Sequence, residues 1–434
     1  MPKPRLLFLS LANDPGSDRI IAAMARLGAD CGAVGPAGAF ALRSRFVGDT
    51  FALGCLSTLL PQSLSLAPRL RHIVRSWRPD LLVPLDDLAS RVLRDPRLSA
   101  SDAEFAHLIE RSLGRPAHFD VACSRNKLTE LAKRIGIRTP REAAIQDLDA
   151  ALRAAALTGY PAVLKREQTC GGVGVAIVRD EAELRRIFRK ALLRASAKRC
   201  LGFLPGFRAS EANPLTLQSF VPGTLAFTTL ACAGGTVLEL ASFKAECRNP
   251  PDTGASTVIS AFANQEMAEA SRRLVEALGC SGFVSFDFIL SPDEKACLIE
   301  MNARPIATGH LGRLYGHDIY AAMIAHLEGF SPGPIDASEG PLSVALFPRE
   351  LDRDPASALV DRAEALHDIP FDDPPVIEAC VTWLEKRHPR ERALLHKRLE
   401  AAAQAPRMAR PAEDRSKAEQ LPTGKTASLN GLSA

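Results

Sequence analysis

The chain has 434 residues, of which 46% are hydrophobic and 24% are charged. A chain of this length holds several domains with large buried cores, and the composition is that of an ordinary globular protein. The net charge of +4 is small for this length, and no nucleic-acid-binding motif is present, so we expect no nucleic-acid partner. No segment reaches the ~20 apolar residues that span a bilayer, so we expect no membrane partner either.

The ten cysteines are scattered singly, without a C-x-x-C pair or a regular spacing. This distribution indicates neither a zinc site nor a disulfide framework. Free thiols are typical of a reducing compartment, and the sequence therefore predicts a cytoplasmic location.

Residues 1–119 alternate between strand-like and helical segments, which predicts a parallel α/β domain. The apolar run after Lys3 and Arg5 leads into Asn-Asp-Pro-Gly without a small-residue cleavage site, so a first buried strand is favoured over a signal peptide. The predicted strands are Leu6–Ala12, Cys31–Val34 and Leu81–Leu85, and the predicted helices are Asp18–Leu27 and Leu59–Trp77.

Asp86 and Asp87 directly follow the last of these strands. Ligands bind near the carboxyl ends of parallel strands, which would place this pair near a site. The alternative is a helix N-cap, which we favour.

Residues 120–200 begin with a helix that Ser124 caps and Gly136 ends, followed by a helix over Asp147–Leu157. A strand with Lys165 at its end then leads into the Gly-rich segment TCGGVG. Backbone amides of such a loop approach a phosphate closely, and a neighbouring lysine supplies positive charge. The strand Val175–Val178 and the charged helix Glu181–Leu193 follow.

Residues 201–330 carry a strand that ends in a Pro-Gly turn at Thr216–Gly223, a hairpin and the helix Gln265–Leu278. The hairpin strands are Phe227–Ala233 and Thr236–Phe243, and we expect Arg248–Thr257 to form a polar loop.

A second hairpin, Phe283–Leu290 with Ala296–Asn302, carries the strongest functional signal. Strand alternation places Asp287 on the face opposite Phe286 and Phe288, and Glu300 shares a face with Asn302. Two carboxylates and an amide oxygen on one surface suit Mg²⁺ bound together with polyphosphate. The alternative is a half-buried hairpin with a polar outer face.

Beyond residue 330 the chain becomes richer in proline. We expect a C-terminal extension over residues 331–404, with a strand at Leu342–Phe347 and a charged helix at Ala379–Ala403. The tail from residue 405 has little to pack, and disorder is expected there.

The order of these motifs resembles the ATP-grasp superfamily, closest to its carboxylate–amine ligase and carbamoyl-phosphate-synthase-like branch. The motifs are a lysine-bearing helix, a strand with lysine, a Gly-rich loop, a strand with a Pro-Gly turn, and an acidic hairpin with E-x-N-x-R. The resemblance implies an α/β fold in which a Rossmann-like domain, residues 1–119, precedes a two-subdomain grasp over residues 120–200 and 201–330.

The resemblance also implies roles for individual residues. Lys127 and Lys165 match the lysines that contact the ATP phosphates, and Arg304 matches an arginine that faces the γ-phosphate and acyl phosphate. The matched flap glycines are Gly171, Gly172 and Gly174. The matched adenine segment includes Gln218, Phe220 and Val221. The matched ligands of Mg²⁺, or Mn²⁺, are Asp287, Glu300 and Asn302.

From the residues alone, three of these roles keep an alternative. Lys165 is alternatively an ordinary lysine at a strand end, and Lys127 is alternatively part of a solvated basic helix face. Gln218 is alternatively a polar residue of an edge strand. Arg248, in the expected polar loop, is a weaker candidate for binding a substrate carboxylate. Thr224, Leu225 and Ala226 offer no acidic residue after the Pro-Gly turn, where family members often hold the ribose.

The resemblance implies an ATP- and Mg²⁺-dependent ligase that joins a small carboxylate to an amine through an acyl phosphate. Two alternatives stay open, a biotin-carboxylase-like activation of bicarbonate and a non-catalytic ATP-binding regulatory module. A homodimer is possible on the same grounds.

Overall fold

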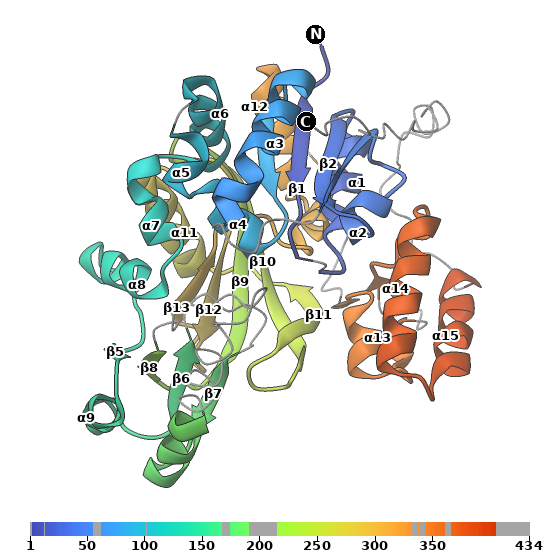
Figure 1. The fold of residues 1–434 in the computed structure, drawn as a ribbon. Coiled ribbons are helices and arrows are strands. Elements are labelled where there is room, and N and C mark those ends of the chain that lie inside the picture. The colour runs from blue at the N-terminus through green and yellow to red at the C-terminus, as the bar shows by residue number, and fades with distance from the viewer. Residues whose placement is uncertain are drawn as a thin grey trace.

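The computed structural model describes residues 2–12, 14–54, 62–100, 102–166, 174–190, 215–331, 333, 335, 337, 343–360 and 366–404. These residues form three sheets with flanking helices (Figure 1). No helix among them is long and apolar enough to cross a membrane. The expected disordered tail lies outside the described residues.

The N-terminal sheet is parallel, as the alternating sequence predicts. Its strands run in the order β3-β2-β1-β4 and are β1 (Arg5–Leu9), β2 (Asp30–Pro36), β3 (Asp49–Leu53) and β4 (Leu81–Pro84). Leu6 and Phe8 of β1 pack in one core with helix α1 (Asp18–Arg26). Leu7 and Leu9 pack in another with helix α3 (Gln62–Trp77). The sheet is therefore buried on both faces, which explains the unbroken apolar run of the first strand.

Shorter helices follow β4 and connect this sheet to the rest of the chain. They are α4 (Asp87–Leu93), α5 (Pro96–Ser99), α6 (Ala103–Leu113), α7 (Phe119–Ala122) and α8 (Arg125–Arg134), with α2 (Phe40–Arg43) before β3. Asp86 caps α4, because its carboxylate accepts a hydrogen bond from the Ala89 amide at 2.8 Å. Ser124 caps α8 as predicted.

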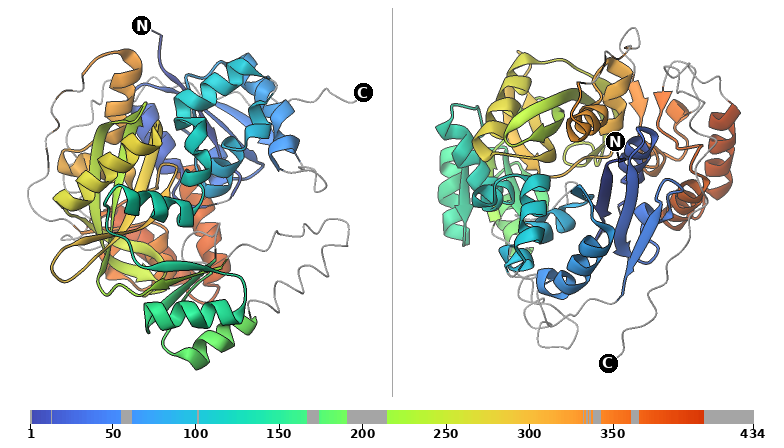
Figure 2. Two further views of the ribbon diagram at one scale, coloured as in Figure 1. Left: turned by 90° about the vertical axis from the view of Figure 1, so that its left-hand side faces the viewer. Right: turned by 90° about the horizontal axis from the view of Figure 1, so that it is seen from above.

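A small antiparallel sheet follows, in the order β5-β8-β6-β7. Its strands are β5 (Glu142–Ile145), β6 (Ala162–Arg166), β7 (Val175–Val178) and β8 (Leu215–Ser219). Helix α9 (Leu148–Thr158) and the helical residues 181–190 pack on one face, where Ala155 and Phe188 meet Leu164. The small sheet thus draws a strand from beyond residue 200, and it lies at one end of the molecule (Figure 2).

The large sheet has the order β13-β12-β9-β10-β11-β14-β15. Its strands are β9 (Thr224–Ala233), β10 (Thr236–Asn249), β11 (Ala255–Ala261), β12 (Gly282–Leu290), β13 (Ala296–Asn302), β14 (Ser343–Ala345) and β15 (Leu366–His367). Helices α11 (Gln265–Leu278) and α12 (Ile319–Glu328) pack against it. The predicted polar loop is wrong at both ends, because Arg248 pairs with Ser256 in the β10–β11 ladder.

The C-terminal helices are α13 (Arg349–Arg353), α14 (Pro374–Arg387) and α15 (Arg392–Gln404). The single helix predicted over Ala379–Ala403 is wrong, because the helix is interrupted at residues 388–391, where Pro389 lacks an amide proton and clashes with the preceding turn. These helices share a core with Phe40 of α2, beside the N-terminal sheet (Figure 1). Three 3₁₀ helices complete the described elements, at Pro116–His118, Gly309–Tyr315 and Ala358–Val360.

Candidate active site

The β12–β13 hairpin gathers the predicted acidic residues. Asp287 lies opposite Glu300 in the ladder, and Ser285 lies opposite Asn302. Asn302 donates a side-chain hydrogen bond to Asp287. On the other face Phe286 and Phe288 are fully buried in the core under α11. The strand alternation that the sequence predicts is therefore present, and it places two carboxylates and an amide oxygen side by side.

Asp287 lies in an environment that opposes its negative charge. Burial, and then the charge of Glu300, raise its pKa to about 7, although the Asn302 hydrogen bond and the charges of Arg304 and Arg125 act in the opposite direction. Two carboxylates this close repel each other unless a cation lies between them. Within the described ranges no group of three or more His, Cys, Asp or Glu side chains forms a metal site. The donor set is instead two carboxylates and an amide, which fits a hard cation that also takes oxygens from a ligand.

Arg125 joins this group and was missed by the sequence reasoning. Its Nη2 and Nε lie 2.5 and 3.1 Å from Glu300 Oε1, and its Nη1 donates to the Arg166 carbonyl at 2.9 Å. Arg125 is the first residue of α8, directly after the Ser124 cap, so its side chain points away from the helix body toward β13. No local sequence pattern indicates this contact, because it depends on how α8 approaches β13.

The structure does not bring Lys127 into this group. Its ammonium pairs with Asp120 at 2.8 Å, and its side chain is 54% exposed. Lys127 lies two residues after Arg125, and positions two apart do not share a helix face.

Lys165 of β6, by contrast, is buried beside the acidic group. Burial lowers the pKa of its ammonium, whereas the charges of Glu300, Glu142 and Asp287 raise it. No hydrogen bond joins Lys165 Nζ to any described residue. A buried ammonium that lacks an acceptor is suited to an anionic ligand.

The Gly-rich loop joins β6 and β7, which pair as an antiparallel hairpin. Gly171 and Gly172 lie outside the described residues. Gly174 is described, with φ +77, and its carbonyl accepts a hydrogen bond from the Arg166 amide at 3.0 Å. Strand β6 therefore continues one residue beyond Lys165, to Arg166.

Gln218, Phe220 and Val221 lie at the end of β8 and in the connection to β9. Gln218 is buried and its Nε2 donates to Glu142 Oε2 on β5 at 3.1 Å. Burial raises the pKa of Glu142, which the Gln218 hydrogen bond partly opposes. Phe220 is 37% exposed, and Val221 lines a cavity of about 480 Å³ at the connections between the small and large sheets.

Arg248 lies at the end of β10 and donates to the Gly254 carbonyl at 3.1 Å. Burial lowers the pKa of its guanidinium, and the charges of Asp252 and Asp287 act against that shift. Arg248 therefore lies within electrostatic reach of the acidic group.

Arg304 follows β13 and is held by the N-terminal part of the chain. Its Nε and Nη2 donate to the two carboxylate oxygens of Asp87 at 2.8 and 3.1 Å. Ser90, one turn further along α4, donates to the Ala303 carbonyl at 2.9 Å. Asp86 therefore caps α4, as favoured from the sequence, and Asp87 contacts Arg304, a predicted site residue.

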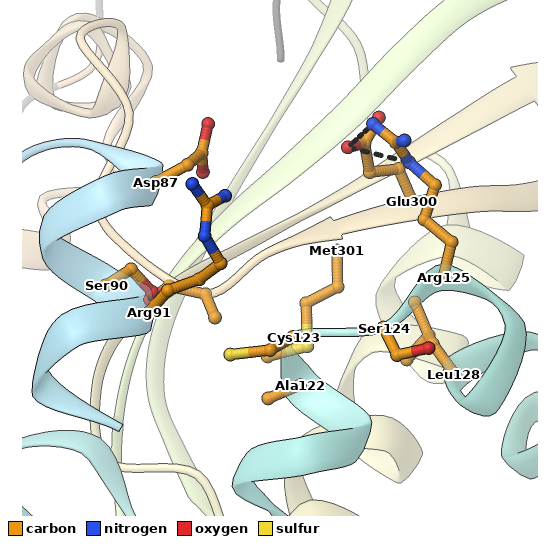
Figure 3. Close-up of a pocket in the computed structure, with 11 residues that line it drawn as sticks. Asp87, Ser90, Arg91, Ala122, Cys123, Ser124, Arg125, Leu128, Glu300 and Met301 are labelled. Atoms are coloured by element: carbon orange, nitrogen blue, oxygen red, sulfur yellow. Dashed lines mark hydrogen bonds and ion pairs between the residues drawn. The ribbon is translucent and has the colours of Figure 1, made fainter. Parts of the chain in front are cut away.

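A cavity of about 60 Å³ lies between α4, the start of α8 and β13. Figure 3 shows Asp87 and Arg91 on one side of it and the hydrogen-bonded pair of Glu300 and Arg125 on the other, with Cys123 below. The cavity thus adjoins the acidic group from the side of the N-terminal sheet.

The chain is similar to several known proteins. Residues 124–212 match the family model described as carbamoyl-phosphate synthase L chain, ATP binding domain. The chain is 25% identical over 205 residues to the carbamoyl phosphate synthase large chain of Pseudomonas syringae, covering 44% of this chain and 17% of that protein. It is 26% identical over 247 residues to the formate-dependent phosphoribosylglycinamide formyltransferase of Burkholderia vietnamiensis, covering 56% of this chain and 57% of that protein.

Among solved structures, the fold is similar to the biotin carboxylase domain of Hydrogenobacter thermophilus 2-oxoglutarate carboxylase, crystallised as a dimer with MgADP, ADP and bicarbonate. The TM-score is 0.54 at 18% identity, over 77% of this chain and 70% of that one. The matches to the curated relatives cover less than two thirds of those proteins. These matches agree with the resemblance to the ATP-grasp superfamily, and residues 124–212 are similar to the ATP-binding domain of the carbamoyl phosphate synthase large chain.

Proposed function

We propose that this protein is an ATP- and Mg²⁺-dependent ligase that phosphorylates a small carboxylate and joins it to an amine. One observation carries the proposal. The Asp287 and Glu300 carboxylates share a surface with the buried ammonium of Lys165, whose Nζ has no acceptor among the described residues. A polyphosphate with its metal ion supplies the opposite charge to both.

The residues present fit Mg²⁺. Asp287 and Glu300 are hard oxygen donors held opposite each other, and Asn302 is hydrogen-bonded to Asp287 and carries a further amide oxygen. The raised pKa of Asp287 reflects its burial and then the charge of Glu300, and a divalent ion between the two carboxylates would relieve their repulsion. When bound, the ion neutralises charge on the phosphates that it contacts.

Lys165 and Arg125 are then the cations that face the phosphates from the small-sheet side. Arg125 already joins α8 to both sheets, through Glu300 on β13 and the Arg166 carbonyl on β6. The flap with Gly171, Gly172 and Gly174 covers the phosphates in this proposal. The segment from Gln218 to Val221 meets the adenine, and Lys127 keeps only a surface position.

The chemistry requires positioning and charge neutralisation rather than a nucleophilic side chain. A carboxylate oxygen of the substrate attacks the γ-phosphorus, so a C–O–P bond forms as the bond to ADP breaks. The amine then attacks the acyl carbon, inorganic phosphate leaves, and the amine nitrogen loses a proton. Arg304 stabilises negative charge on the transferred group, and Arg248 holds the substrate carboxylate.

The remaining parts of the chain have supporting roles in the proposal. Residues 1–119 form the Rossmann-like domain that precedes the grasp, and its α4 supplies Asp87 to Arg304. Residues 331–404 form an extension that packs on that domain through α2. The reactants are small molecules, and a homodimer is compatible with the dimeric carboxylase domain of similar fold.

A second candidate function is activation of bicarbonate, which the similarity to a bicarbonate-bound carboxylase domain favours. A third is a non-catalytic nucleotide-binding module. Phosphate release that depends on bicarbonate alone distinguishes the second from the lead proposal, and tight binding of Mg·ATP without any phosphate release distinguishes the third.

The decisive experiment measures phosphate release from Mg·ATP with pooled amines and small carboxylates. Wild type is compared with Glu300→Gln and with Glu269→Gln, a control on the exposed side of α11. We expect release that needs both a carboxylate and an amine, is lost in Glu300→Gln and is retained in Glu269→Gln. Undiminished release in Glu300→Gln would show that the metal assignment is wrong.

A further inference from the structure

The cavity between α4, the start of α8 and β13 contains one charged group that the proposed chemistry does not use. The Glu300 carboxylate there forms an ion pair with Arg125, and the Asp87 carboxylate forms one with Arg304. Arg91 also lines this cavity. No hydrogen bond or ion pair links its side chain to any other residue of the described ranges.

Arg91 is placed to act at this cavity. It lies four residues after Asp87 on α4, so the two side chains emerge on the same side of the helix. Figure 3 shows its guanidinium on the α4 side of the cavity, near Asp87 and across from Arg125 and Glu300. Both carboxylates that line the cavity have other arginine partners, and neither forms an ion pair or hydrogen bond with Arg91.

The rest of the lining is compatible with an anion. Ser124 and Arg125 are the cap and first residue of α8, so the positive end of that helix dipole lies at the cavity wall. Burial raises the pKa of the Cys123 thiol, which therefore stays neutral. The volume of about 60 Å³ admits a carboxylate or a phosphate group, since a cavity needs only ~10–15 Å³ for one water molecule.

We propose that Arg91 binds an anionic group of a substrate, one that is not itself activated. One of the two reactants therefore carries a carboxylate or phosphate in addition to its reacting group, and Arg91 selects for it. This inference rests on the proposed ligase function, since the cavity adjoins the carboxylates assigned to the metal. It adds the chemical class of a substrate and a specificity-determining residue.

The first test is equilibrium binding of three probe anions, inorganic phosphate, malonate and succinate, to the full chain saturated with Mg·ADP. Calorimetry compares wild type with Arg91→Ala, Arg91→Lys and the control Arg111→Ala, an exposed arginine on α6. We expect at least one probe to bind wild type and Arg111→Ala equally. Arg91→Ala should weaken that binding about tenfold or more, and Arg91→Lys by less.

Two results overturn the inference, namely equal probe binding in Arg91→Ala and wild type, or no binding of any probe to wild type. Binding of Mg·ADP is measured separately on each variant. It should be unchanged in Arg91→Ala, which also shows that the variant is folded. If wild type does not bind Mg·ADP at all, the ligase proposal itself is contradicted. Failure of the ligase proposal is therefore distinguishable from failure of the Arg91 inference.

Matched substrates then identify the reactant that carries the anion. Butyrate is compared with succinate as the carboxylate, and propylamine with β-alanine as the amine. Preference for succinate assigns the extra charge to the carboxylate substrate, and preference for β-alanine assigns it to the amine. In either case Arg91→Ala should raise the KM of the preferred compound and leave the KM of ATP unchanged. An equal rate with both members of each pair contradicts the inference.

Discussion

Arg304 and Asp87 form a bidentate ion pair between parts of the chain 217 residues apart, with N–O distances of 2.8 and 3.1 Å. Asp87 belongs to α4, next to the N-terminal parallel sheet, and Arg304 follows β13 of the large sheet. Both side chains are mostly buried, at 14% and 24% exposure. A planar guanidinium held by two parallel hydrogen bonds has a fixed orientation. The N-terminal part of the chain therefore sets where Arg304 points.

Replacing Asp87 with Asn removes the charge and one acceptor from this pair. We expect kcat for phosphate release to fall about tenfold, because Arg304 loses its fixed position, while Mg·ADP binding changes little. Steady-state kinetics and calorimetry check this. Asp149→Asn, an exposed change on α9, is the control. An unchanged kcat in Asp87→Asn would show that this pair is only structural.

Lys165 and Lys127 provide a matched comparison. Lys165→Met removes the buried ammonium beside Glu300, and we expect phosphate release to fall by about a hundredfold or more. Lys127→Met removes an exposed ammonium that pairs only with Asp120 among the described residues, and release should stay within about twofold. An equal decrease in phosphate release in the two variants would show that Lys127 also contacts the phosphates.

The raised pKa of Asp287 predicts a pH dependence of stability in metal-free protein. Since this pKa is about 7 in the folded chain against an ordinary 3.8, the folded state holds the proton more tightly between these values. The contribution of Asp287 to the free energy of unfolding is therefore present at low pH and is lost as pH rises through 7.

Asp287→Asn removes this titration. In EDTA, we expect the variant to gain stability relative to wild type as the pH is raised from 5 to 8. Urea denaturation at several pH values measures the difference, and added Mg²⁺ should stabilise wild type but not the variant. Parallel stability curves for the two proteins would contradict the raised pKa.

Gln218 and Glu142 face each other across β8 and β5, joined by a hydrogen bond of 3.1 Å. Gln218→Glu places a second buried carboxylate opposite the first, which should destabilise the protein by about 1–3 kcal/mol at pH 8 and less at pH 5. The double change Glu142→Gln with Gln218→Glu exchanges donor and acceptor and should recover most of the loss. Urea denaturation of the single and double variants tests this, and a double variant no better than the single one would disprove the pairing.

The acidic hairpin could be predicted from sequence because strand alternation alone decides which side chains share a face. Asp287, Glu300 and Asn302 therefore gather as expected. Arg125 and Asp87 could not be found in this way. The Arg125 contact depends on how α8 approaches β13, which leaves no local pattern in the sequence. The strand end before Asp87 indicated a nearby site, but its pairing with Arg304 depends on how α4 packs beside the end of β13.

The predicted boundaries of some strands and helices are wrong where the local sequence pattern did not decide the structure. The polar segment that contains Arg248 reads as a loop, yet pairing with β11 extends β10 to Asn249. In the C-terminal region, the pattern of charges predicted one continuous helix through Pro389. In the structure the first helix ends before this proline.

The small sheet is joined to the rest of the described chain by two short crossings, 137–141 and 220–223, which run side by side. The Ser219 amide, just before the second crossing, donates to the Arg141 carbonyl at 2.8 Å, and the Leu298 amide of β13 donates to the Arg138 carbonyl at 2.9 Å. The first crossing is therefore bonded both to the small sheet and to the large one. Because Lys165 belongs to the small sheet and Asp287 to the large sheet, the backbone conformation of these crossings sets the distance between the ammonium and the carboxylates.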